Sequence, residues 1–166
     1  MQWGRLLAHL FTDHRSIRRA FPATSMRSIE AVVADEEKRH AGELRFAVEA
    51  SLPLGALLSG ISSRERAVDW FARLRVWDTE DNCGVLIYLL LADKRVEIVA
   101  DRGIHRKVGP AAWDAICGEM QREFARGEFE SGVVIGLGAI SDLLAAHFPA
   151  GDGDNPNELP DAPVVL

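Results

Sequence analysis

The sequence has 166 residues, of which 48% are hydrophobic and 27% charged, a balance typical of one globular domain with its own core. The formal net charge is −6, and no dense basic cluster is present, so we expect no nucleic-acid partner. The two cysteines, Cys83 and Cys117, lie far apart in apolar segments, which excludes a cysteine-based metal motif and predicts two buried thiols.

The charge is distributed unevenly. Residues 1–19 carry four arginines and one aspartate, whereas residues 149–166 carry four acidic residues and no lysine or arginine. Charged residues interrupt the apolar N-terminal stretch, so no secretory signal is expected. The longest apolar stretches are too short or too polar to cross a bilayer. We therefore expect a cytoplasmic protein without a transmembrane segment.

The first predicted element is an amphipathic helix over residues 2–20, in which apolar residues recur at three- and four-residue spacing. The Phe21-Pro22 pair ends this helix and delimits an N-terminal segment, residues 1–22. Its arginines at positions 15, 18 and 19 indicate contact with anionic lipid or, as the simpler alternative, a helix that lies on the domain with its charges in water.

The main domain, residues 23–148, alternates helical and strand patterns. Helical spacing of apolar residues, next to capping residues, prolines or glycines, predicts helices over residues 26–41, 63–76, 110–127 and 130–147. Strand patterns cover residues 44–49, 84–92 and 95–100, and residues 51–61 are a connection. We expect Gly42 to end the first of these helices in a left-handed conformation. The first strand alternates and should bury one face, whereas the second is apolar on both faces and should be central.

The order of these elements predicts the fold. The first two strands and the helix between them should form a right-handed βαβ unit, and a tight turn at Asp93-Lys94 returns the third strand antiparallel. We therefore predict an α/β fold, a three-layer α/β/α sandwich with a small mixed sheet. The acidic, proline-rich tail over residues 149–166 is predicted to be disordered or loosely docked, with its last four residues as a candidate docking peptide.

Several spaced sequences agree in order with one known family. They are Gly-Glu-Leu-Arg-Phe-Ala-Val-Glu at residues 42–49, Glu-Asp-Asn-Cys-Gly-Val-Leu-Ile at 80–87, Val-Ala-Asp-Arg-Gly at 99–103 and Phe-Ala-Arg-Gly-Glu-Phe at 124–129. With these segments, residues 25–148 resemble the TPM-domain family. Its members include thylakoid-lumen proteins linked to photosystem II repair, a nematode receptor auxiliary protein and bacterial proteins. Some members are described as acid phosphatases, and some bind divalent metal ions.

The sequence departs from this family in two respects. Many members carry a signal peptide or a membrane anchor, and neither is expected here. Residues 104–108 read Ile-His-Arg-Lys-Val, a basic loop where relatives often have an acidic, glycine-rich turn. That loop, with His105 beside three basic residues, is predicted either to receive a phosphate group or to be a solvated turn.

Acidic residues are predicted to gather at one edge of the sheet, where the first two strands begin and the third ends. Asp78, Asp81 and Asn82 precede the central strand, Glu43 precedes the first strand, and Asp101 follows the third. Oxygen ligands from several segments suit a hard cation, so these five residues are candidate ligands for Ca²⁺ or Mg²⁺. No organic cofactor is expected. The alternative is that these residues are ordinary turn formers and surface charges.

Strand pairing ranks the candidates. A tight turn at Asp93-Lys94 would pair Asp101 with Leu86, which leaves Asp101 roughly 13 Å from Asn82 at the usual rise of a strand. On that register His105 lies nearer to Asn82 than Asp101 does. The pairing therefore favours Asp78 and Asp81 as ligands over Asp101 and Glu43.

Two functions fit the sequence. No serine-hydrolase, P-loop or zinc-protease motif is present, which favours an accessory or binding domain that holds a divalent metal and acts on a membrane-associated protein partner. The family resemblance and the acidic edge favour the alternative, a metal-assisted acid phosphatase that acts on phosphomonoesters.

Overall fold

The computed structural model describes residues 3–152 and 156–166. Residues 2 and 153–155, which the sequence assigns to the N-terminal helix and to the tail, lie outside the described residues. One sheet has the strand order β3-β2-β1-β4. Its strands are β1 (Leu44–Glu49), β2 (Val85–Leu90), β3 (Arg95–Ala100) and β4 (Val164–Val165). Strands β1 and β2 are parallel and β3 runs antiparallel to β2, which confirms the mixed sheet.

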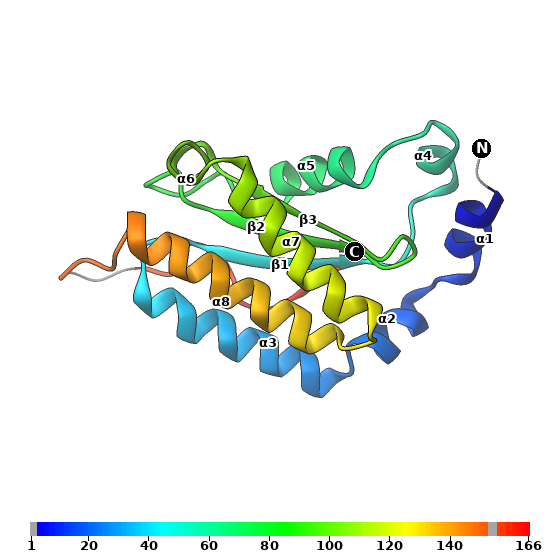
Figure 1. The fold of residues 1–166 in the computed structure, drawn as a ribbon, viewed down its shortest axis with the longest axis horizontal. Helices are drawn as coiled ribbons and strands as arrows, with labels where there is room; N and C mark the ends of the chain where they lie inside the picture. Colours follow the sequence, from blue (N-terminus) through cyan, green and yellow to red (C-terminus); the bar gives the residue numbers. More distant parts are fainter. Residues whose placement is uncertain (1–2, 153–155) are drawn as a thin grey trace.

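Helices cover both faces of the sheet (Figure 1). On one face lie α3 (Ala23–Glu36), α7 (Pro110–Ala125) and α8 (Phe129–His147), and α5 (Ser63–Arg73) covers the other. The remaining elements are α1 (Trp3–Phe11), α2 (His14–Ala20), η1 (Glu37–Arg39), α4 (Leu54–Leu58) and α6 (Arg102–Val108). The predicted three-layer α/β/α arrangement is therefore confirmed.

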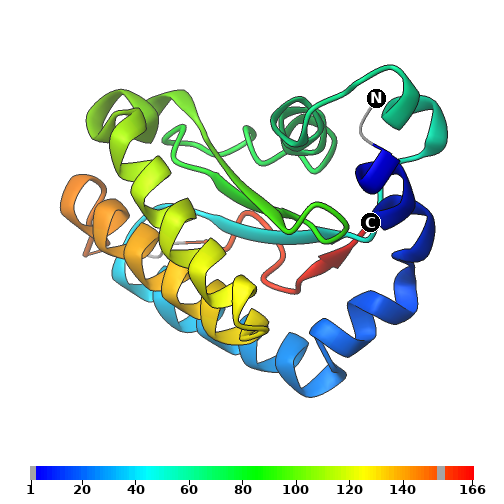
Figure 2. The ribbon, with the colours of Figure 1, turned by 45° about the vertical axis from the view of Figure 1, so that its right-hand side comes forward.

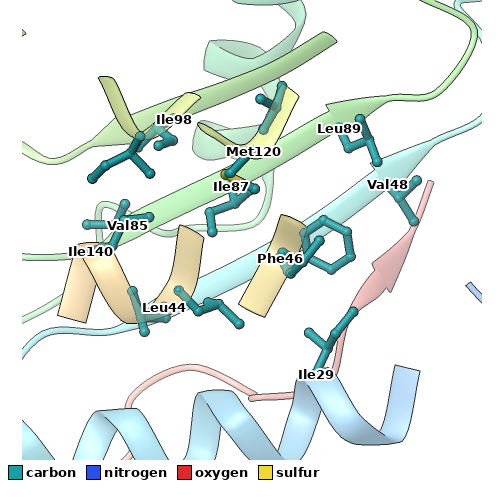
Figure 3. Close-up of a cluster of buried hydrophobic side chains, with 14 of the residues drawn as sticks. Ile29, Leu44, Phe46, Val48, Val85, Ile87, Leu89, Ile98, Met120 and Ile140 are labelled. Carbon is teal, nitrogen blue, oxygen red and sulfur yellow. The ribbon is translucent and has the colours of Figure 1, made fainter. Parts of the chain in front are cut away.

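The core has two parts, because side chains alternate across the sheet. One part packs alternate residues of β1 and β2 against α3, α7 and α8, with Met120 and Ile140 between them (Figure 3). The other part packs Tyr88 and its neighbours against α5. Every residue of β2 is buried, as expected for a central strand. Full burial of one large apolar side chain contributes about 1.5–3 kcal/mol, so the two parts of the core supply most of the stabilisation of the folded state.

Helices α7 and α8 pack closely because α8 has glycines at the contact. A Cβ atom on Gly136 would lie 2.4 Å from Met120 Sδ, and one on Gly132 would lie 2.5 Å from a ring carbon of Phe124. Close packing therefore explains these two glycines. By length and composition, α8 is also the one helix among the described residues that could cross a membrane, a test that core helices of folded domains pass as well.

Strand β1 is buried on both faces, which corrects the expectation of one buried face. Its polar residues Arg45 and Glu49 are 8% and 5% exposed. Glu49 accepts hydrogen bonds from Tyr88 Oη at 2.6 Å, from Trp70 Nε1 at 3.2 Å and from two nitrogens of Arg66. This network attaches α5 to the sheet.

The C-terminal segment covers Arg45, so the expectation of a disordered tail does not describe residues 156–166. Strand β4 pairs with β1 in parallel, and the Leu166 N–H donates to Val48 O at 2.9 Å. Arg45 donates to the carbonyl oxygens of Pro160 and Ala162, and Leu159 is buried. Figure 2 shows this segment, in red, beside β1.

Several local expectations are corrected. The N-terminal helix is broken, because Asp13 caps α2 in a reciprocal capping box with Ser16. Helix α3 ends at Glu36, before Gly42, and Gly42 has no positive φ. A Cβ atom on Gly42 would lie 2.6 Å from a methyl carbon of Leu144, so close packing explains this glycine instead. The connection at 51–61 contains α4, and the basic loop forms α6.

Candidate functional site

The sheet edge where β1 and β2 begin and β3 ends brings acidic residues together. The Val85 N–H donates to Glu43 O at 2.8 Å, and the Asp101 N–H donates to Gly84 O at 2.9 Å. Glu43 and Asp101 therefore flank Gly84 on the two neighbouring strands.

This register differs from the predicted one by two residues. Leu90 pairs with Arg95, so the hairpin loop spans residues 91–94. The loop is longer than predicted because the Leu91 N–H donates to the carbonyl oxygen of Glu49, the last residue of β1, and the Ala92 N–H donates to that of Ala50. Asp101 is consequently level with Gly84 instead of Leu86.

The shifted register also changes the expected position of His105. It lies in α6 and lines a cavity of about 250 Å³ with Trp113 and Cys117. The register on which the sequence placed His105 nearer to Asn82 than Asp101 is therefore wrong.

The turn before β2 rests against the start of α6. The Gly103 N–H donates to Asn82 O at 2.9 Å. A Cβ atom on Gly103 would lie 2.4 Å from Asn82 O and 2.8 Å from Asp81 O, so only glycine lets the two segments approach this closely. Asn82 itself has a φ of 52°, a left-handed conformation that asparagine tolerates well.

The electrostatics of Cys83 show which carboxylates lie near one another. Cys83 is fully buried, and burial raises the pKa of its thiol to about 12. The nearby charges of Asp81, Glu158, Glu43 and Asp101 add to this effect. The thiol is unsuited to act as a nucleophile, and these four carboxylates share one region of the molecule.

Asp78 takes no part in this group. Its carboxylate pairs with the guanidinium of Arg75, and both side chains are exposed. It is the one predicted ligand that the structure assigns to a local surface ion pair, a contact of little energetic weight.

Asp101 differs from the other acidic residues of the described chain in having one hydrogen-bonded and one buried, unpartnered carboxylate oxygen. It is 6% exposed, and its Oδ1 atom accepts the Arg102 N–H at 2.6 Å as the N-cap of α6. Its Oδ2 atom is buried without a hydrogen-bond partner. A buried polar atom without a partner costs about 1–3 kcal/mol, and more if the group is charged.

Glu43 is held by the C-terminal segment. It is 1% exposed, and its two carboxylate oxygens accept the N–H groups of Glu158 at 3.2 Å and Leu159 at 3.0 Å. Burial raises the pKa of Glu43 although these two hydrogen bonds oppose the change. Glu158 in turn accepts the Glu80 N–H, so it bridges the tail and the turn. Sequence reasoning missed Glu158. The available signal was the pair of β-branched residues in β4, Val164 and Val165, which follows the acidic part of the tail and is typical of a strand.

A second acidic region lies next to Glu43. Glu37, Glu43 and Asp161 line a cavity of about 310 Å³. Burial raises the pKa of Glu37 to about 8, opposed by the Leu44 N–H, while Glu43 and Asp161 raise it further. A pKa near 8 favours the protonated, uncharged form of Glu37 at neutral pH.

The Glu37 pKa predicts how stability depends on pH. Because its folded pKa lies above the ordinary value of 4.5, its contribution is fully present below pH 4.5 and is lost as the pH rises through about 8. Glu37→Gln should remove that loss, which amounts to about 5 kcal/mol for a rise in pKa of this size. The check is urea denaturation of both proteins between pH 4.5 and 9, and parallel stability profiles would contradict the prediction.

No group of three or more His, Cys, Asp or Glu side chains in residues 3–152 and 156–166 is already arranged to hold a metal ion. The fit of a cation to the acidic edge therefore rests on the orphaned Oδ2 atom of Asp101 and on the carboxylates beside it.

Comparisons with known proteins identify the family. The family model of the TPM domain matches residues 19–143. The chain belongs to the TPM-domain family. The NMR structure of the BA42 protein from the psychrophilic bacterium Bizionia argentinensis is similar, with a TM-score of 0.78 and 31% sequence identity. The match covers 88% of this chain and 95% of BA42. No curated protein sequence matches this chain.

Proposed function

We propose that this TPM domain is an accessory or binding domain that holds one divalent cation, Ca²⁺ or Mg²⁺, at the acidic edge of its sheet. Asp81, Asn82 and Asp101 are the proposed first ligands, and Glu43 and Glu158 supply further carboxylates from β1 and from the C-terminal segment. The partner we propose for this domain is a membrane-associated protein.

The observation that carries the proposal is the buried, unpartnered Oδ2 atom of Asp101. A buried charge is tolerated when it is paired or coordinates a metal, and Asp101 has no cationic side chain hydrogen-bonded to it among the described residues. A cation there would offset the desolvation of Asp101 and the mutual repulsion of the neighbouring carboxylates. Hard oxygen ligands from separate segments are what Ca²⁺ and Mg²⁺ require.

Thermal unfolding with and without Ca²⁺ or Mg²⁺ tests the proposal. A cation at a hundred times its Kd adds about 2.7 kcal/mol of stability, which raises Tm by roughly 5–10 °C in a domain of this size. Asp101→Asn keeps the helix cap but removes the charge, so it should abolish the shift in Tm without lowering the Tm of the metal-free protein.

Asp78→Asn is the matched control, because Asp78 pairs with Arg75 at the surface. Its shift in Tm should equal that of the wild type. A wild-type Tm that does not change with any of Ca²⁺, Mg²⁺ or Mn²⁺ would rule out the cation site.

The second candidate is a metal-assisted phosphomonoester hydrolase. One observation favours it: Arg102, next to Asp101 in the first turn of α6, is exposed and is available to pair with a phosphate. Hydrolysis of p-nitrophenyl phosphate with Mg²⁺, lost in Asp101→Asn and weakened in Arg102→Gln, would support this candidate. A wild-type rate equal to that of the buffer would exclude it.

A further inference from the structure

Helix α1 docks on the domain through its polar side. Arg5 donates to both carboxylate oxygens of Asp93 at 2.9–3.1 Å. His9 is 5% exposed, with Nε2 2.9 Å from Asp93 Oδ1. The Leu52 N–H donates to His9 Nδ1 at 3.0 Å, which assigns the ring proton to Nε2. Burial opposes ionisation of Asp93, but the hydrogen bonds from Arg5 and His9 outweigh it and lower the pKa of Asp93.

The apolar side of α1 consequently faces away from the domain. Trp3, Leu7, Leu10 and Phe11 are 74%, 51%, 63% and 80% exposed. Their spacing places them on one stripe of the helix, the stripe that a helix on a globular protein normally buries. Helix α1 therefore lies on the domain with its apolar side outward, which the expectation did not include, whereas Arg15, Arg18 and Arg19 of α2 are exposed as expected.

A second helix extends this surface. Leu54 and Leu58 of α4 are each 56% exposed. Helices α1 and α4 lie at the same end of the molecule in both ribbon views (Figures 1 and 2). Leu10 and Leu54 line one cavity of about 390 Å³. We call the six side chains the apolar end: Trp3, Leu7, Leu10, Phe11, Leu54 and Leu58. They make up six of the ten exposed large hydrophobic residues in the described ranges.

The exposed charges next to the apolar end are mostly basic, and among the described residues the one carboxylate there is that of Asp13, which caps α2 and lines the cavity between Leu10 and Leu54. Residues 50–63, which include α4, contain no charged residue. Helix α2 follows α1 directly, buries Ile17 and exposes Arg15, Arg18 and Arg19. The protein as a whole carries −6, so this concentration of arginines is local.

We propose that the apolar end is a docking surface for an anionic lipid bilayer. Aromatic and leucine side chains on one helical stripe, next to exposed arginines, match the interfacial zone of a bilayer and its anionic headgroups. Charge complementarity favours this occupant over a second copy of the chain, since a two-fold contact through the same face would bring two sets of arginines together. This surface is independent of the proposed cation site.

Vesicle flotation of the full chain tests the proposal. Vesicles of phosphatidylcholine and phosphatidylglycerol at 7:3 should carry the protein, and vesicles of phosphatidylcholine alone should carry at least tenfold less. Fluorescence of Trp3 should be quenched by brominated lipid, and Trp3→Phe should remove that quenching. Recovery of no wild-type protein with the anionic vesicles would overturn the proposal.

Paired variants locate the surface. Leu7→Glu/Phe11→Glu changes only exposed side chains and should weaken binding by about a hundredfold or more. Arg18→Gln/Arg19→Gln should weaken it by about fivefold for each arginine. Val68→Glu/Trp77→Glu adds the same two negative charges at exposed apolar positions elsewhere, and its binding should stay within about fivefold of wild type. Equal losses in the first and third pairs would overturn the proposal. So would a wild-type dimer in solution that Leu7→Glu/Phe11→Glu dissociates, because that result would make a second copy the occupant.

Discussion

Glu49→Ala should lower the free energy of unfolding by about 3 kcal/mol. The substitution removes the carboxylate of the sheet that is hydrogen-bonded to Arg66 and leaves Tyr88, which is fully buried, without the acceptor of its hydroxyl group. Breaking one side of a buried ion pair leaves an uncompensated charge, which is why the loss exceeds that of a surface pair. Urea denaturation followed by far-UV circular dichroism measures it.

Asp35→Ala is the control for that experiment. The pair that Asp35 forms with Lys38 has side chains that are 81% and 74% exposed, and it should contribute less than about 0.5 kcal/mol. Similar losses in Glu49→Ala and Asp35→Ala would show that the buried network does not attach α5 to the sheet.

Gly84→Ala should destabilise the protein by about 3 kcal/mol. A Cβ atom at this position would lie 2.0 Å from the backbone oxygen of Val76, which no side-chain rotation relieves. The segment that leads into β2 would have to move, and with it the turn that carries Asp81. Thermal or urea unfolding measures the loss.

Gly118→Ala is the matched substitution, because nothing lies within 4 Å of a Cβ atom at this position in α7. There the exchange should stabilise the helix by up to about 1 kcal/mol through its higher helix propensity. If Gly84→Ala were as stable as wild type, the close approach of Val76 to Gly84 would be contradicted.

Local pattern was sufficient to predict the layers of the fold. The residues that make β2 apolar throughout and give α5, α7 and α8 their helical spacing are the same residues that pack in the core. The spacing of apolar residues in the sequence therefore predicts these four elements directly. The ends of elements were harder to predict. The hairpin loop spans four residues because Leu91 and Ala92 donate hydrogen bonds to Glu49 and Ala50, at the end of β1, and the sequence of the hairpin does not reveal these contacts.

Contacts between distant residues account for the parts of the site that sequence reasoning missed. Topology alone brought Glu43 and Asp101 to the edge that also holds Asp81. Glu158 reaches that edge only because the tail binds Glu43, 115 residues away in sequence. Conversely, the helical pattern of α1 predicts an apolar stripe correctly but does not determine which side of the helix meets the domain.

The two proposed surfaces lie at opposite ends of the sheet. Glu43 precedes β1, whereas Leu52 and α4 follow it, and the six residues of β1 span about 20 Å at the usual rise of a strand. A bilayer at the apolar end would leave the acidic edge facing the aqueous phase. Cation binding and lipid binding are therefore expected to be independent, and the two sets of variants should not affect each other's measurements.

The most direct test of the cation site is a titration of isotope-labelled protein with Ca²⁺ and Mg²⁺, followed through backbone amide shifts. We predict saturable shifts concentrated at Asp81, Asn82 and residues 101–103, absent in Asp101→Asn and retained in Asp78→Asn. Shifts that do not saturate, or that fall elsewhere on the surface and persist in Asp101→Asn, would contradict a cation site at the acidic edge.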